Sequence, residues 1–168
     1  RYGYEGSNGG CGFWEQCAQW QSFQDYPEEM FTSYNFDVWL NNNHRHFENE
    51  WMRYASYWLQ SYWTMKHGIE TIGNIWRESV YPEDAISAYT RLYCNGDWSK
   101  TKKELYDYAS RMATFDIDGV REYSEGYLGR YHTTFYTSGE YYQMAYANCP
   151  ETTGFNVIPL NVPDAGNM

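Results

Sequence analysis

Residues 47–76 read FENEWMRYASYWLQSYWTMKHGIETIGNIW, and this stretch decides the predicted fold. Large apolar side chains recur in it at steps of three or four residues, which is the spacing of one face of an α-helix. The residues of this stripe are Phe47, Trp51, Tyr54, Trp58, Tyr62, Met65, Ile69, Ile72 and Trp76. The stripe predicts a long helix, and a break near Gly68 would divide it into two helices that share one face.

A second row of apolar residues, Ala55, Leu59 and Trp63, runs beside the stripe at four-residue spacing. The apolar face is therefore wider than packing against one neighbouring helix requires. One interpretation is a core helix of a small helical domain; the other is that part of this aromatic wall contacts a ligand or a partner. The candidate ligand-binding residues on the second interpretation are Trp51, Tyr54, Trp58, Tyr62, Met65 and Trp76, with Tyr127 and Tyr131 further along the chain.

Composition and charge narrow the class of protein. The chain has 168 residues, a length typical of one domain, and 21% of them are aromatic. Because Tyr and Trp bring O–H and N–H groups into a core, such an interior suits a ligand that is mostly apolar with a few polar ends. The net charge of −10 argues against nucleic acid as a partner. No apolar run approaches the ~20 residues of a membrane span.

Most of the remaining chain also has helical periodicity. Helices are expected from Glu28 to about Phe36, around Ile86 to Tyr93, and from the capping box at Thr101 onward. A further helix is expected from Asp118 to Phe135, restarting from Ser138 to about Ala147. Residues 1–10 and 151–168 have no period and are predicted to be an irregular arm and tail. The sequence thus predicts one compact all-α domain of six or seven helices.

Four cysteines, Cys11, Cys17, Cys94 and Cys149, lack the paired spacing of a zinc site. Two disulfides are the favoured interpretation, and the sequence allows three pairings. We favour Cys11–Cys17 as a local bridge and Cys94–Cys149 across the chain. Disulfides, together with a chain that begins at Arg1 and is interpreted as a processed form, predict a secreted, extracellular protein.

Residues 93–104, YCNGDWSKTKKE, have the pattern of an EF-hand loop between two helices. Asn95, Asp97 and Glu104 occupy its third, fifth and twelfth positions, where calcium ligands belong. However, Tyr93 replaces the first ligand and Trp98 replaces the turn glycine, so calcium is not expected to be required. A second string, residues 114–125, carries Asp116, Asp118 and Glu125 in similar places but begins too soon for two complete tandem hands.

On these loops, residues 31–145 resemble a degenerate member of the EF-hand superfamily, in the group of sarcoplasmic calcium-binding proteins and photoproteins. The resemblance implies degenerate helix-loop-helix units in a compact helical bowl that encloses a large apolar ligand. It implies a cavity more than it implies calcium.

The motifs of common enzymes are missing from this sequence, which has no G-x-S-x-G, H-E-x-x-H or phosphate-binding glycine loop. The sequence therefore predicts a non-enzymatic binding protein for a mostly apolar, conjugated or lipid-like molecule, such as a carotenoid-type pigment, with no required cofactor. A homo-oligomer formed through aromatic surface is a further expectation. The alternatives are a Tyr-rich structural or matrix protein and a calcium-binding EF-hand protein.

Overall fold

The stretch that decides the fold forms two helices and a short 3₁₀ turn, rather than one long helix, in the computed structural model, which describes residues 12–160. Helix α3 (Trp58–His67) and helix α4 (Glu70–Glu78) are separated at Gly68, whose φ of 93° ends α3. The expected break near Gly68 is confirmed. The expected helix over residues 47–57 is wrong. There the Asn49 side chain accepts from Trp51 N at 3.1 Å and caps only the 3₁₀ turn Glu50–Met52.

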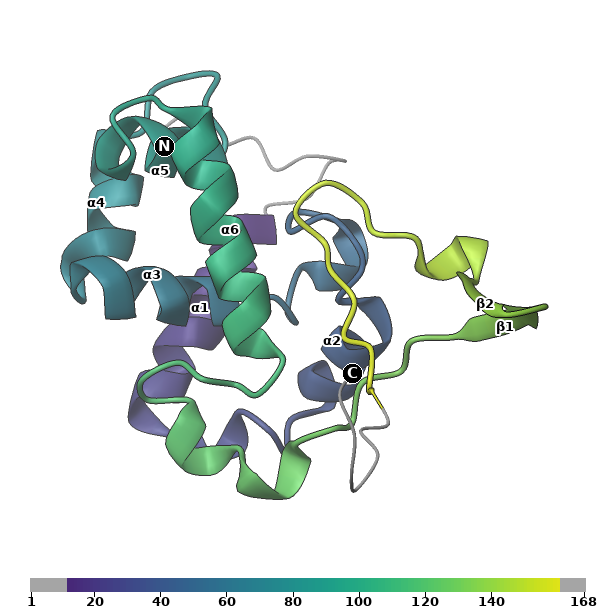
Figure 1. The fold of residues 1–168 in the computed structure, drawn as a ribbon. Helices are drawn as coiled ribbons and strands as arrows, with labels where there is room; N and C mark the ends of the chain where they lie inside the picture. The colour runs from purple at the N-terminus through teal and green to yellow at the C-terminus, as the bar shows by residue number, and fades with distance from the viewer. Residues whose placement is uncertain (1–11, 161–168) are drawn as a thin grey trace.

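The described part of the chain is a mostly helical single domain with six α-helices and one small β-hairpin (Figure 1). Its other helices are α1 (Gly12–Asp25), α2 (Tyr34–Asn42), α5 (Ala85–Tyr93) and α6 (Trp98–Met112), and its strands are β1 (Phe135–Ser138) and β2 (Tyr141–Met144). The helical class predicted from the sequence is therefore confirmed in outline, and the two strands correct the all-α expectation.

Helix α3 lies at the centre of an aromatic core. Trp58, Tyr62 and Trp63 are each 0% exposed. Trp58 packs against Trp39 of α2 with 5.4 Å between ring centroids and against Phe115 at 5.8 Å. Aromatic pairs at these distances add to the hydrophobic gain of burial, so rings take the place of the aliphatic side chains that this sequence lacks.

Residues 118–149 form 3₁₀ turns and the hairpin, and the two helices expected there are wrong. Strands β1 and β2 pair antiparallel, with Ser138 opposite Tyr141 across a two-residue turn. Gly139 has a φ of 62° in that turn, a conformation that glycine adopts at no steric cost. Phe135, Tyr136 and Thr137 of β1 are aromatic or β-branched, and such residues favour an extended strand.

The expected cross-chain disulfide is wrong, because Cys94 and Cys149 are both free thiols. Cys94 caps the end of α5 and is 1% exposed, whereas Cys149 is exposed and follows the hairpin. Cys17 is also a free thiol and lies beside Trp76, whose indole N–H donates to its Sγ at 3.4 Å. Burial raises the pKa of the Cys17 thiol to about 12. Cys11 lies outside the described residues, as do the arm 1–10 and the end of the tail.

Candidate functional site

The predicted aromatic wall divides into buried and exposed residues. Trp58 and Tyr62 are fully buried, whereas Trp51 is 63% and Tyr54 is 43% exposed. Met65 and Trp76 are partly buried at the border of the core. The residues of the stripe therefore do not share one face, because the chain turns between residues 50 and 58.

Tyr127 and Tyr131 do join Trp58 in one cluster, although neither lies on an α-helix. Tyr127 stacks on Phe31 with 4.9 Å between centroids, and Phe31 contacts Trp58 at 5.2 Å. Tyr131 stacks on Phe115, which also contacts Trp58. Rings fill the space between these side chains, so this cluster is packed core.

A hydrogen-bond network joins α3, α5 and α6 beside that core. The Tyr89 hydroxyl donates to Glu104, and His67 Nε2 lies 2.8 Å from the same hydroxyl. Because the hydroxyl proton is given to Glu104, His67 donates from Nε2. Burial raises the pKa of Tyr89, as does the Glu104 carboxylate, and burial lowers the pKa of His67. The Tyr89 hydroxyl, the Glu104 carboxylate and His67 Nε2 thus have their partners within the protein.

Asp97 and Glu104 of the EF-hand-like loop are engaged in hydrogen bonds within the protein. Helix α6 begins at Trp98, inside the stretch that was expected to be a loop. The Asp97 side chain caps this helix by accepting from Ser99 N at 2.8 Å, while Glu104 points to Tyr89. Asn95 has a φ of 55° in the turn between the helices. Two of the three proposed ligands are thus engaged in helix capping and core hydrogen bonds.

The second expected loop is held by arginines. Asp116 pairs with Arg111 at 3.2 Å and with Arg121 at 2.6 Å, and Asp118 also pairs with Arg121. Among residues 12–160, no three His, Cys, Asp or Glu side chains are grouped so that they could hold a metal ion.

A hollow lies between α6 and the C-terminal segment 152–158, and we call it the α6 groove. Its volume is about 530 Å³, within the range of small-ligand sites. It is lined by Lys102, Leu105, Tyr106, Ala109, Ser110, Ala113, Thr152, Thr153, Gly154, Phe155, Asn156, Val157 and Ile158. Apolar side chains dominate this lining, and Lys102 is the only charged residue among these described ones.

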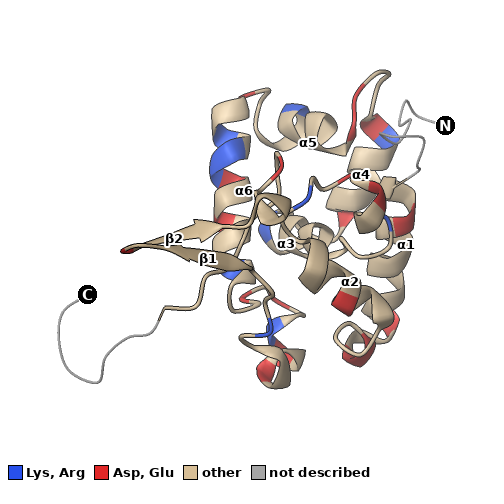
Figure 2. Ribbon diagram, turned by 90° about the vertical axis from the view of Figure 1, so that its right-hand side faces the viewer, with Lys and Arg blue, Asp and Glu red and all other residues tan. Residues whose placement is uncertain are grey.

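Helix α6 supplies one side of the groove through the face on which Leu105, Ala109 and Ala113 recur. The alanines leave space there that a larger side chain would fill. Figure 2 shows Lys and Arg residues along α6, and Lys102 lies in its first turns. One part of the groove thus carries positive charge and the rest is mostly apolar.

The other side of the groove is fixed by hydrogen bonds to residues 43–47. Glu151 N donates to His44 O at 2.8 Å and Phe155 N donates to Asn43 O at 3.0 Å. The Asn43 side chain returns a bond to Phe155 O at 2.9 Å. We call this set of contacts the 43–155 clamp. The clamp holds the irregular C-terminal segment in one position, because its hydrogen bonds satisfy the backbone N–H and C=O groups of that segment as a helix or sheet would.

Gly154 permits this clamp to form. A Cβ atom at Gly154 would overlap the carbonyl group of His44 and lie 2.8 Å from Arg45 O. Only glycine allows the two backbones to approach so closely. The adjacent Phe155 ring then packs edge-on against Tyr108 with 5.7 Å between centroids, which connects the groove to the core.

Comparison with protein families gives a match over residues 1–168. The chain belongs to DUF6055, a family of unknown function. No curated protein and no solved structure matches it. No helix in the described part of this DUF6055 chain is long and apolar enough to cross a membrane. Function therefore has to be argued from the site itself.

Sequence reasoning missed the α6 groove. Its C-terminal side lies in the segment that was expected to be an irregular tail, and the clamp joins residues 112 positions apart. Gly154 was the one available signal, since a lone glycine between larger residues marks a close backbone approach.

Proposed function

We propose that this protein is a non-enzymatic binding protein for a mostly apolar, lipid-like or conjugated small molecule, and that the ligand lies in the α6 groove. The observation that carries the proposal is a hollow of about 530 Å³ with a mostly apolar lining on a fixed backbone. The ligand does not lie against the buried side of the aromatic wall, because Trp58 and Tyr62 are fully covered by other protein atoms.

The ends of the groove fit a ligand of mixed character. Leu105, Phe155 and Val157 offer apolar contact, and the exposed ring of Tyr106 stands at the border. Lys102 offers a cation for a carboxylate or another anionic end group. A fatty-acid-like molecule satisfies both features, since its tail is apolar and its head is anionic.

The test is a titration with Nile red, a neutral apolar dye whose emission reports the polarity of its surroundings. Ala109→Trp fills the groove, and Ala18→Trp is the matched control because Ala18 is exposed on α1 and does not line the groove. We expect Ala109→Trp to raise the dissociation constant at least ~10-fold, or about 1.4 kcal/mol, and Ala18→Trp to change it less than ~2-fold. Thermal melts of both variants show whether folding is retained.

Two further comparisons assign the site. If Trp58→Phe weakens dye binding and Ala109→Trp does not, the ligand site is the aromatic wall and the proposal is wrong.

The role of Lys102 in binding the end group is tested by comparing displacement of the dye by oleate with displacement by oleyl alcohol. Lys102→Met should weaken oleate by about 3- to 10-fold and leave the alcohol unchanged, because only oleate has a carboxylate. Equal effects on both would refute a role for Lys102.

A further inference from the structure

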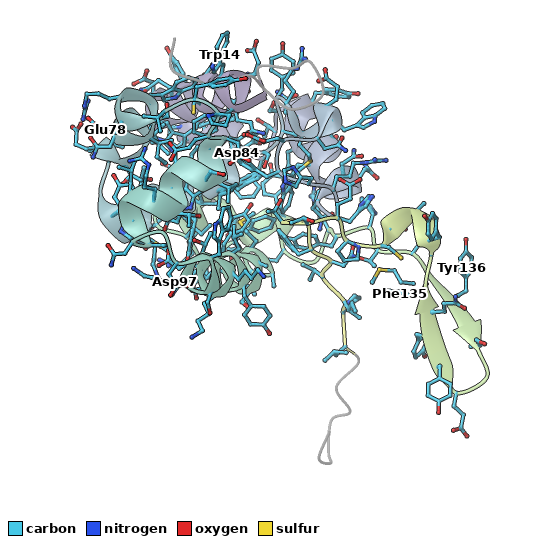
Figure 3. The ribbon with its side chains drawn as sticks, turned by 90° about the horizontal axis from the view of Figure 1, so that it is seen from above. Trp14, Glu78, Asp84, Asp97, Phe135 and Tyr136 are labelled. Carbon is cyan, nitrogen blue, oxygen red and sulfur yellow. The ribbon has the colours of Figure 1, made fainter. Side chains whose placement is uncertain are left out.

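The β-hairpin stands away from the helical body, and six of its eight strand residues are exposed. Figures 1 and 3 show β1 and β2 projecting from the domain, with Tyr136 directed outward. Tyr136 is 61%, Tyr141 is 77% and Tyr142 is 81% exposed. An isolated two-stranded hairpin is marginally stable in water, and further strands or a covering element normally support it.

The register shows which backbone groups of the hairpin point outward. Antiparallel partners alternate between hydrogen-bonded and non-bonded pairs. Ala145 N donates to Thr134 O at 2.9 Å, so this pair is bonded, and the next pair toward the tip, Phe135 and Met144, is not. By the same alternation, the pair of Thr137 and Tyr142 is not bonded either. The N–H and C=O groups of these four residues therefore point away from the partner strand.

Neither outer edge is protected in the usual way. Phe135 and Thr137 on β1, and Tyr142 and Met144 on β2, have no backbone partner for their outward groups among the described residues. Edge strands of monomeric proteins normally carry a charged residue, a proline or a bulge that prevents pairing with another chain. Residues 133–149 contain no proline and a single charged residue, Glu140, which lies in the turn.

The scarcity of charge on the hairpin favours a second copy of this chain as its partner. A net charge of −10 opposes association of two copies, but the hairpin carries almost none of that charge and extends away from the body (Figure 2). Like strands of two copies pair antiparallel around a two-fold axis, which uses the same surface on each copy and closes the assembly.

Side chains on the hairpin support that arrangement. Tyr136 and Tyr141 share one face, because Tyr141 is opposite Ser138 and Ser138 lies two residues after Tyr136 on the same strand. At about 200 Å² for a whole Tyr side chain, these two tyrosines expose roughly 300 Å² per copy. Edge pairing of two hairpins places four such rings on one face of a four-stranded sheet.

We propose that the protein forms a homodimer by edge-to-edge pairing of its hairpins, through β1 with β1 or β2 with β2. This inference is independent of the ligand proposed for the α6 groove. The interface is small compared with the ~1,200–2,000 Å² of stable complexes, so we expect a weak dimer with a dissociation constant of roughly 10–500 µM.

Proline variants at outward N–H groups test the pairing with little disturbance of the hairpin itself. Thr137→Pro removes a donor from the outer edge of β1, and Tyr142→Pro removes one from the outer edge of β2, while the inward ladder retains its bonds. Sedimentation velocity of the full chain from ~5 µM to ~1 mM measures association. We expect wild-type protein to dimerise and one of the two variants to raise the dissociation constant at least ~10-fold.

Amide hydrogen exchange by NMR locates the interface. At high protein concentration the outward N–H groups of one strand should become protected, Phe135 and Thr137 or else Tyr142 and Met144, while the inward N–H of Tyr136 is protected at all concentrations. A wild-type chain that stays monomeric to ~1 mM would overturn the proposal. So would a dimer that both proline variants form with unchanged affinity, since that dimer uses another surface.

Discussion

Replacement of Gly154 by alanine should detach the C-terminal segment from the helical body. A Cβ at this position would overlap the His44 carbonyl group, and this obstacle is backbone that no side-chain rotation can move. The Cβ would lie 1.9 Å from His44 O, so the segment has to shift by roughly 1.5 Å to restore a normal van der Waals contact. A shift of that size breaks the short hydrogen bonds on either side of it.

The cost follows from the contacts of the 43–155 clamp. Besides its three bonds to Asn43 and His44, Phe47 N donates to the Thr153 hydroxyl at 2.8 Å and His46 N donates to the Glu151 carboxylate at 2.6 Å. If two to four of these bonds are lost at about 1 kcal/mol each, the free energy of unfolding falls by about 2–4 kcal/mol. At about 2–4 °C per kcal/mol, the melting temperature should fall by about 5–15 °C.

Thermal and urea unfolding measure this change, and Gly73→Ala is the matched control. Gly73 lies in α4, and apart from its chain neighbours and the backbone of its own helix nothing lies within 4 Å of the position that a Cβ would occupy. Alanine should therefore stabilise the protein by about 0.5–1 kcal/mol. Gly154→Ala should also weaken Nile red binding, since the segment forms one side of the groove. If Gly154→Ala melts within ~1 °C of wild type, the close approach of the two backbones is absent and the clamp is refuted.

Three other outcomes are expected. Tyr89→Phe removes the hydroxyl that donates to the buried carboxylate of Glu104 and should cost about 2 kcal/mol in urea unfolding; an unchanged midpoint would contradict the network. Burial lowers the pKa of His67 below its ordinary value, so the unfolded state binds more protons than the folded state. The free energy of unfolding should therefore fall as the pH drops below about 6.5, and it should fall less in His67→Gln. Parallel curves of unfolding free energy against pH for the two proteins would refute this. Alkylation of unreduced, denatured protein should label both Cys94 and Cys149, and a cross-linked peptide of the two would contradict it.

Local signals in the sequence predicted the parts of the fold that local interactions determine. The end of α3 and the start of α4 follow from Gly68, whose positive φ is available because it lacks a Cβ. Helix α5 was expected around Ile86 to Tyr93, and the Asp84 side chain caps it by accepting from Ser87 N at 2.7 Å. These features depend on residues within one or two turns of each other.

The errors arose where tertiary contacts override a local pattern. Tyr123, Tyr127, Tyr131 and Phe135 recur at four-residue steps, which indicates a helix. In the structure, Tyr127 and Tyr131 instead reach the core from 3₁₀ and irregular backbone and pack on residues far away in sequence. Tyrosines spaced four residues apart therefore reach the core here without lying on one α-helix. The α6 groove could not be predicted for the same reason, since one of its sides is placed by contacts to residues 43–47.

The surplus width of the aromatic face has a structural explanation in the position of α3. Trp58 faces α2 and Phe115, Trp63 stacks on Tyr89 of α5 with 4.4 Å between centroids, and Tyr62 contacts Tyr108 of α6. A helix with neighbours on several sides is apolar around most of its circumference, and the two rows read from the sequence are two of those sides. A ligand that reached Trp58 would have to displace rings that already fill the core at close packing. Binding at the edge of this core needs no such displacement, because Phe155 and Leu105 extend its apolar surface to the groove that α6 forms with segment 152–158.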